Sequence, residues 1–333
     1  MIKTVSYIFP IYNESENIDL LYKTMNDLLR QHAAEYLYEL IFVNDGSTDD
    51  SLQKLLSLEK QDDRITVINF ARNFGHQLAV TAGLDFAKGD AVIIMDSDMQ
   101  DPPRVSFELL DKWKEGYDVV YAQRRTRKDT FFKRVTADIF YRVLQKLSDI
   151  DIPRNTGDFR LVDRKVVTAL SAFREHNRFL RGLVSYVGFK QIAVEFDRDE
   201  RNAGASGYPL HKMIKFALDG ILSFSWTPLK LISRMGFGLA ALSFVGICYA
   251  VGVKLMNPAV AVPGWTFTVI AILLIGGLQL NMLGVLASYV GRIYTEAQNR
   301  PLYIIESITT KDRQKLPFSI ITAKQSHAAI TEQ

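Results

Sequence analysis

The sequence is poor in cysteine and has no large excess of charge of either sign. Cys248 is its one cysteine, which excludes a disulfide within the chain and any cysteine-based zinc cluster. Lys and Arg number 40 against 37 Asp and Glu, a net charge of +3, so the strong basic field that duplex nucleic acid requires is missing. We expect no nucleic-acid partner and a catalytic domain that faces the cytosol.

Two further signals are missing. The N-terminal residues MIKTVSYIFP contain no basic segment followed by a long apolar stretch, so they do not resemble a secretory signal, and we expect the first domain to stay on the side of the membrane where it is made. Neither a lysine-bearing phosphate loop nor a GxGxxG fingerprint occurs, which disfavours P-loop and dinucleotide chemistry.

What the sequence does have is a long apolar region near its C-terminus. No Asp, Glu, Lys or Arg occurs at 235–253 or at 255–291. A helix over the first run would be roughly 28 Å long at about 1.5 Å per residue, close to the thickness of a bilayer core. Prolines at 258 and 263 indicate a turn before a second helix over 265–290. We predict a transmembrane hairpin, and a buried helical hairpin of a soluble protein is the less expected alternative.

Basic residues flank this hairpin, and its connecting loop carries little charge. By the positive-inside rule both outer ends, and so both chain termini, are expected in the cytoplasm. The flanking residues are Lys230, Arg234, Arg292 and Arg300. The segment 209–233 before the hairpin mixes lysines with apolar residues, which indicates interfacial helices.

The first part of the chain alternates short apolar runs with helix-like stretches, which predicts an α/β fold with a mostly parallel, doubly wound sheet and helices on both faces. The apolar runs lie at 5–9, 40–43, 65–70, 91–95 and 119–122. In such sheets ligands bind beyond the carboxyl ends of the strands, where the polar residues of this sequence gather.

Asp96 and Asp98 follow the fourth apolar run, one residue apart. Two carboxylates at a strand end can hold a hard cation, Mg²⁺ or Mn²⁺, which can bridge a diphosphate and neutralise its charge as a sugar leaves. Alone, this spacing is a weak signal, since acidic residues before a helix often cap it, as we expect for Asp101. For Asp45, in VNDGSTDDS, a turn role is possible, but we favour a functional one.

Several motifs in order, FPIYNE, VNDGSTD, MDSDMQDPP, RNTGDFRL and RNAGASGYP, closely resemble the inverting glycosyltransferases of family 2, in particular the polyprenyl-phosphate branch. The resemblance covers nearly the whole chain and implies a GT-A fold with a cytoplasmic catalytic domain. It implies a nucleotide-sugar pocket lined by Pro10, Tyr12, Glu14, Asp45 and Asp96. It implies a metal diphosphate site at Asp96, Asp98 and Gln100. It implies acceptor-side roles for Arg124, Asp158, Arg201 and Ser206.

This resemblance implies inverting transfer of a hexose, glucose favoured, from a UDP-sugar to polyprenyl (undecaprenyl) phosphate at the cytoplasmic membrane, for modification of cell-envelope glycans. Mg²⁺ or Mn²⁺ would be the cofactor, and relatives suggest a homo-oligomer. The expected domains are a catalytic domain over 1–208, interfacial helices over 209–233, a hairpin over 234–291 and a cytoplasmic tail over 292–333.

The acceptor limits what Asp158 has to do. A phosphate monoester has a second pKa of about 6 and is largely dianionic at neutral pH, so it needs little help from a general base. The harder task is to hold two anionic groups, the acceptor phosphate and the diphosphate, near one anomeric carbon. Our hypothesis is that Arg124 and Arg201 clamp the phosphate, with Asp158 orienting an arginine or the acceptor and acting as base for a protonated fraction only. One departure concerns Gly207, where relatives commonly carry Lys. His76 is expected near the donor and is left without a role.

Other functions remain open at this point. N-acetylglucosamine is the second candidate for the sugar. A processive polysaccharide synthase would normally show a QxxRW motif and more membrane helices, and a nucleotidyltransferase would not explain the hairpin. A non-catalytic membrane scaffold is the alternative outside the enzymes, which the acids Asp96, Asp98 and Asp158 disfavour.

Overall fold

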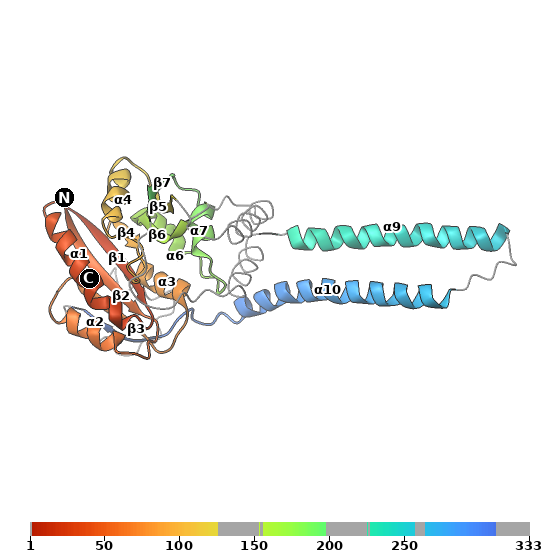
Figure 1. Cartoon of the computed structure of the whole chain (residues 1–333), viewed down its shortest axis with the longest axis horizontal. Helices are drawn as coiled ribbons and strands as arrows, with labels where there is room; N and C mark the ends of the chain where they lie inside the picture. The colour runs from red at the N-terminus through yellow and green to blue at the C-terminus, as the bar shows by residue number, and fades with distance from the viewer. Residues whose placement is uncertain are drawn as a thin grey trace.

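The computed structural model describes residues 2–125, 153, 156–197, 225, 227–256 and 264–310. In them a single sheet lies between two groups of helices, and two long helices project away from this body (Figure 1). The elements before the hairpin are β1 Lys3–Ile11, α1 Ser15–Gln31, β2 Tyr36–Asn44, α2 Ser51–Glu59, β3 Ile65–Phe70, α3 His76–Phe86, β4 Ala91–Ile94, α4 Val105–Lys114, β5 Val119–Arg124, β6 Thr156–Asp163, α6 Arg164–Ser171, α7 Leu180–Tyr186 and β7 Gln191–Phe196. They are followed by α9 Thr227–Met256, α10 Trp265–Ala297 and β8 Ile305–Thr309.

The sheet is mixed, with the strand order β7-β5-β6-β4-β1-β2-β3-β8. Its centre is parallel: β1 pairs with β2 and β4, and β2 pairs with β3. Strand β6 runs antiparallel between β4 and β5, and β8 runs antiparallel at the edge beside β3. The mostly parallel α/β sheet predicted from the sequence is confirmed, and all five predicted strands lie within it.

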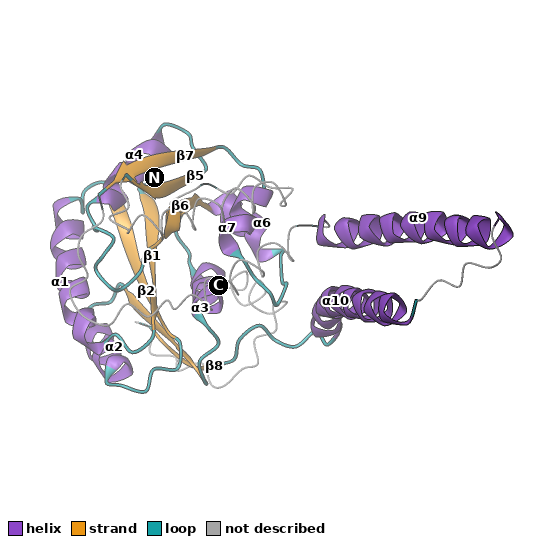
Figure 2. Cartoon of the chain, turned by 45° about the vertical axis from the view of Figure 1, so that its right-hand side comes forward, coloured by secondary structure: helices purple, strands orange, loops and turns teal. Residues whose placement is uncertain are grey.

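Both faces of the sheet are buried, as its parallel centre requires. Helices α1 and α2 cover one face, and α3, α6 and α7 cover the other (Figure 2). Side chains alternate along β1: Tyr7 and Phe9 point to the first face and Ile8 to the second. Ile8 lies against α3 at Gly83, where an added Cβ would come within 2.3 Å of the Ile8 side chain. Helix α3 therefore sits tightly on β1, which fixes the position of its first residue, His76.

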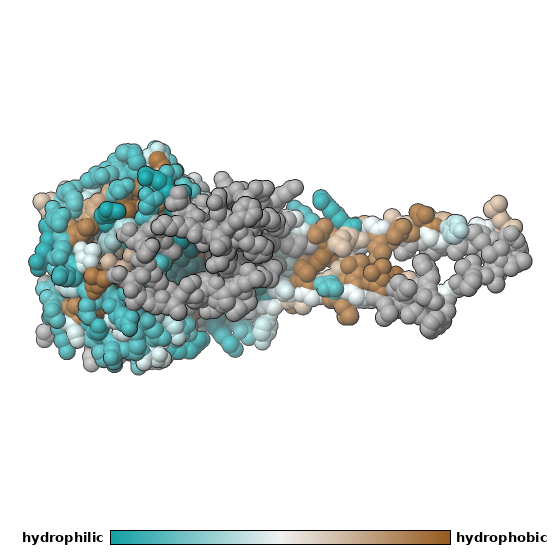
Figure 3. All heavy atoms as spheres, in the orientation of Figure 1, coloured by the Kyte–Doolittle hydropathy of each residue, from teal (hydrophilic) through white to brown (hydrophobic). Residues whose placement is uncertain are grey.

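Helices α9 and α10 form the predicted hairpin. Each contains a stretch long and apolar enough to cross a membrane, Leu229–Gly246 and Leu274–Ala297, and neither stretch is buried inside the protein. Large apolar side chains such as Phe237 and Leu280 are exposed on them. Figure 3 shows apolar surface gathered on this pair of helices, whereas the coloured surface of the body in this view is mostly hydrophilic. Much of the segment predicted as interfacial, 209–224 together with 226, lies outside the described residues, and its end, 227–233, belongs to α9.

The chain returns to the body after the hairpin. Strand β8 lies within the segment that the sequence analysis assigned to a cytoplasmic tail, and its pairing with β3 was not predicted. Tyr303, just before it, stacks on Phe70 with ring centroids 5.2 Å apart and donates a hydrogen bond to Asp85 of α3. Glu306 accepts a hydrogen bond from Asn69. The hairpin is thus followed by residues that belong to the core of the catalytic body.

Candidate active site

The polar residues that the sequence analysis singled out lie beyond the carboxyl ends of β1, β2 and β4. Pro10 is buried in β1, and its carbonyl accepts a hydrogen bond of 3.3 Å from the Ser97 hydroxyl, which links the ends of β1 and β4. Tyr12 is exposed, and Glu14 accepts a hydrogen bond from Asn17 in the first turn of α1. The structure brings these expected donor-pocket residues together at the carboxyl ends of the parallel strands.

Asp45 anchors the loop that leads into α3. Its two carboxylate oxygens accept hydrogen bonds from the backbone N–H groups of Phe74 and Gly75, at 2.6 and 2.9 Å. Burial raises the pKa of the Asp45 carboxyl, although the two amide hydrogen bonds oppose the shift. The next residue, Gly46, has φ +65°, and a Cβ there would lie 2.5 Å from the backbone of Arg72 and Asn73. Only glycine lets the two loops approach this closely.

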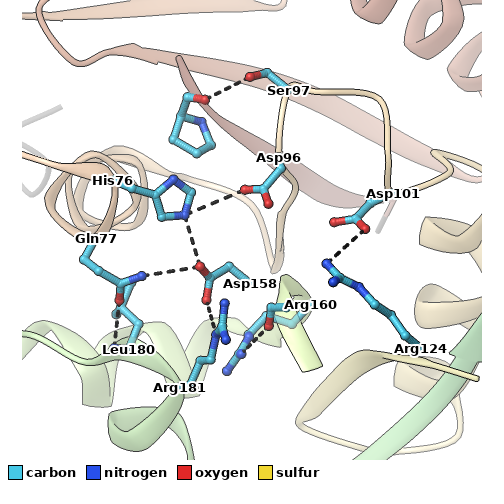
Figure 4. Close-up of polar contacts among 12 residues, drawn as sticks. His76, Gln77, Asp96, Ser97, Asp101, Arg124, Asp158, Arg160, Leu180 and Arg181 are labelled. Carbon is cyan, nitrogen blue, oxygen red and sulfur yellow. Dashed lines mark hydrogen bonds and ion pairs between the residues drawn. The ribbon is translucent and has the colours of Figure 1, made fainter. Parts of the chain in front are cut away.

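Asp158, on β6, is contacted by three side chains (Figure 4). Arg181 Nε lies 2.8 Å from Oδ1, while His76 Nε2 and Gln77 Nε2 lie 3.1 and 3.4 Å from Oδ2. Burial alone would raise its pKa, but the charge of Arg181 and the hydrogen bond with His76 hold the pKa of Asp158 well below its usual range. Asp158 is therefore ionised at any physiological pH.

His76 lies between Asp96 and Asp158. The same Nε2 that contacts Asp158 lies 3.7 Å from Asp96 Oδ1. Burial opposes the protonated imidazole, but the hydrogen bond with Asp158 and the charges of Asp96 and Asp158 outweigh it and raise the pKa of His76 to about 9. A protonated His76 partly neutralises two carboxylates, one on β6 and one in the loop after β4.

Asp96 has the character of a cation ligand. Its Oδ1 is buried and accepts no hydrogen bond, and burial together with the charges of Asp158 and Asp98 raises its pKa against the opposing charge of His76. Asp98 Oδ1 accepts a hydrogen bond from the backbone N–H of Gln100, so the predicted metal residues share one short loop. Their oxygen atoms suit Mg²⁺ or Mn²⁺.

Within the described part of the chain, no three His, Cys, Asp or Glu side chains form a ready-made metal group. A cation held by Asp96 and Asp98 would therefore need further oxygen ligands. Mg²⁺ usually binds in this way, through one or two carboxylates with water and substrate phosphates completing its shell. The residues present fit a metal that arrives with a diphosphate.

Arg124 lies at the end of β5, beside the first residues of β6, the strand that carries Asp158. Its Nη2 lies 3.9 Å from Asp101 Oδ1, and a Cβ on Gly157 would come within 3.4 Å of that same nitrogen. Arg124 is thus placed near Gly157, the neighbour of Asp158, whose carboxylate is predicted to act on the acceptor side. Arg201, Ser206 and Gly207 lie outside the described residues.

Sequence reasoning missed three groups around Asp158. It left His76 without a role and did not single out Gln77 or Arg181. A signal existed for the first two, because RNFGHQ follows the third strand and so reaches the binding edge of the sheet. No comparable signal marks Arg181, an arginine within the helix α7. Arg160, whose pKa burial lowers to about 10, was also missed.

The mixed sheet, with a carboxylate pair beyond one strand and a bonded carboxylate beside it, gives the body an α/β architecture of the GT-A type. The chain belongs to glycosyl transferase family 2, whose model matches residues 6–170. This confirms the family that the motifs predicted.

Two relatives match along nearly their whole length. The chain is 48% identical to an uncharacterized glycosyltransferase, YkcC, of Bacillus subtilis (strain 168), over 90% of this chain and 93% of the relative. It is 41% identical to the SfII prophage-derived bactoprenol glucosyl transferase of Shigella flexneri, over 91% and 97%. A solved glucosyl-3-phosphoglycerate synthase from Mycobacterium tuberculosis, in complex with Mn²⁺, UDP-glucose and phosphoglyceric acid, matches 66% of this chain and 79% of that chain at 19% identity, with a TM-score of 0.44.

Proposed function

We propose that this chain transfers a hexose, glucose favoured, from a UDP-sugar to polyprenyl phosphate, with inversion, at the cytoplasmic face of a membrane. The observation that carries the proposal is the 41% identity to a bactoprenol glucosyl transferase along 97% of that relative, a match that covers 91% of this chain. The two apolar helices after the catalytic body support it, because a lipid acceptor requires an enzyme held at the membrane.

The transfer needs one bond formed and one broken. A phosphate oxygen of the acceptor attacks the anomeric carbon of the sugar, and the bond from that carbon to the diphosphate breaks with its electron pair leaving on UDP. Attack from the side opposite the leaving group inverts the anomeric configuration. The acceptor enters as a dianion at neutral pH, so no proton has to be removed in the step.

The leaving side is assigned to Asp96, Asp98 and Gln100, which would hold Mg²⁺ or Mn²⁺ together with the diphosphate. When bound, the cation supplies Lewis-acid stabilisation of the departing UDP. Pro10, Tyr12, Glu14 and Asp45 are assigned to the nucleotide pocket. The contacts of Asp45 give it a supporting part there, because it fixes the loop 72–75 that precedes His76.

The acceptor side is assigned to Arg124, Asp158, Arg201 and Ser206. A guanidinium near Gly157 can hold a phosphate oxygen while the neighbouring anionic donor is neutralised by its own cation. With its pKa held low, Asp158 is a poor base for a phosphate, which favours an orienting role for it.

We further propose that the catalytic domain spans 1–208, that interfacial helices over 209–233 lead into the hairpin over 234–291, and that both termini lie in the cytoplasm. Protease treatment of inside-out membrane vesicles tests this topology: the catalytic domain should be digested and the loop between the helices protected. Protection of the catalytic domain would overturn it.

Light scattering on the detergent-solubilised chain tests the expected homo-oligomer, and a monomeric mass would contradict it.

The function is tested with the full chain in detergent, Mg²⁺ or Mn²⁺, a short polyprenyl phosphate and a panel of labelled nucleotide sugars. We expect label from UDP-glucose to move into a chloroform-extractable, acid-labile product. A protein that binds UDP yet transfers label from no donor would overturn the proposal. Transfer from UDP-N-acetylglucosamine alone would keep the reaction and replace the sugar.

A further inference from the structure

Asp158 lies beneath two more exposed nitrogen-bearing side chains. Its side chain is 10% exposed, whereas that of Arg181 is 22% and that of His76 is 42% exposed. Arg181 engages one carboxylate oxygen, and His76 and Gln77 engage the other. A substrate that approaches from solvent therefore meets Arg181 and His76 before it meets the carboxylate.

Two guanidinium groups lie close to Asp158. They belong to Arg160 and Arg181, while Asp96, the second carboxylate nearby, is joined to Asp158 through His76 (Figure 4). Arg160 is buried and donates a hydrogen bond of 3.0 Å to the carbonyl of Gly157, so it is fixed within the fold, while Arg181 is the more exposed of the two. The more exposed guanidinium group, that of Arg181, can therefore contact an anion that reaches the site from solvent.

Arg181 also lies on the side of the body that faces the membrane anchor. Helix α7, which carries it, is on the side of the sheet nearest the hairpin (Figure 1). His176, shortly before α7, bonds Glu296 at the end of α10 through its backbone N–H and its Nδ1, and lies 2.8 Å from the carbonyl of Arg300 through its Nε2. A headgroup that reaches the site from the bilayer would arrive along this side.

We propose that Arg181 binds the phosphate of the lipid acceptor, and that Asp158 is the positioning residue that holds the guanidinium of Arg181 in place. The inference rests on the proposed function and adds a binding residue to it. A guanidinium presents its N–H groups in a rigid plane that matches phosphate oxygens. The contact of Nε with Asp158 fixes that plane, and the hydrogen bonds of His76 and Gln77 fix Asp158 in turn.

A phosphate is present on both substrates, so the test separates the two. The full chain in detergent is compared with Arg181→Ala, Arg181→Lys and Asp158→Asn. The Michaelis constant for the polyprenyl phosphate is measured at saturating donor, and the binding of UDP with Mn²⁺ is measured by calorimetry. For Arg181→Ala we expect the Michaelis constant for polyprenyl phosphate, the acceptor constant, to rise about tenfold or more, with unchanged UDP affinity. Arg181→Lys keeps the charge and loses the planar fork, so a smaller rise is expected.

Arg64 provides the matched control, because it forms an ion pair with Asp62, at 2.5 Å, just before β3 and away from the carboxyl ends of the strands. Arg64→Ala should lower thermal stability without changing the acceptor constant. An unchanged acceptor constant in folded Arg181→Ala and Arg181→Lys would overturn the inference, and so would weakened UDP binding alone, which would place Arg181 on the donor. If the wild type transfers no sugar to polyprenyl phosphate, the proposed function fails first, an outcome distinct from either of these.

Discussion

The Tyr303 hydroxyl lies 2.7 Å from Asp85 Oδ2 and ties the segment that follows the hairpin to the helix that begins at His76. Asp85 also pairs with Arg174 through both of its oxygens. The far end of α3 is thereby fixed to the chain that leaves the helical hairpin, while the near end contributes to the candidate active site. The position of α3 therefore depends on the contacts at both of its ends.

Tyr303→Phe should destabilise the protein by about 1–2 kcal/mol, since it removes a hydrogen bond to a charged group and keeps the ring that stacks on Phe70. Thermal denaturation of the detergent-solubilised chain measures the loss. Tyr186→Phe, at an exposed tyrosine, is the control and should leave the midpoint unchanged. Equal midpoints for wild type and Tyr303→Phe would contradict the contact.

Asp158→Asn should lower the catalytic efficiency with the acceptor by a similar factor at every pH from about 6 to 9, because Asp158 is already ionised across this range and acts by orientation. A variant that regains activity as the pH rises would instead identify Asp158 as a base. The folded-state pKa is depressed, so the stabilisation that ionised Asp158 provides is present above its ordinary value of 3.8 and is lost as the pH falls through the lower folded value. Acid denaturation of wild type and variant should therefore converge at very low pH.

The double variant Asp96→Asn with Asp98→Asn should lose at least about 100-fold in activity, because neutral amides bind a divalent cation weakly and leave the departing diphosphate unscreened. Chelation should inactivate the wild type reversibly, with recovery on addition of Mg²⁺ or Mn²⁺. Asp27→Asn, at an exposed position of α1, serves as control. Full activity of the double variant in chelated buffer would contradict the metal site.

Gly46→Ala should destabilise the protein by about 1–3 kcal/mol and weaken UDP binding, because it imposes a strained φ and places a Cβ against the backbone of residues 72 and 73. Gly116→Ala is a matched control, since Gly116 also has a positive φ, +92°, but has no atom within 4 Å of an added Cβ. It should show the strain alone, with normal UDP binding. Equal effects of the two substitutions would indicate that the loop contact at Gly46 is unimportant.

The sequence predicted the parts of the fold that local apolar patterns determine. Strands β1 to β5 and the hairpin helices are continuous apolar runs, so they were predicted, although α9 begins at Thr227 and not at 235. Strands β6, β7 and β8 were not predicted. The five residues of β8, IESIT, have no such run and join the sheet by pairing with a strand more than 200 residues earlier.

The candidate site likewise combines residues that local motifs identify with contacts between distant segments. Asp96, Asp98 and Asp158 belong to motifs that can be identified along the chain, and the structure places them near the carboxyl end of β4. The contact of Arg181 with Asp158 joins α7 to β6, and that of His76 joins α3 to β6, across 23 and 82 positions. Such pairs depend on how helices pack on the sheet, which residue spacing does not specify.

The return of β8 to the sheet limits how this protein can be divided. A soluble fragment that stops before the hairpin would leave β3 as an uncovered edge, with backbone N–H and C=O groups ready to pair with another molecule. It would also lack Tyr303, Ile305 and Ile308, which are buried against the second face of the sheet. A water-soluble version of the enzyme therefore has to carry the segment 301–310 rejoined to the catalytic body by a linker in place of the hairpin.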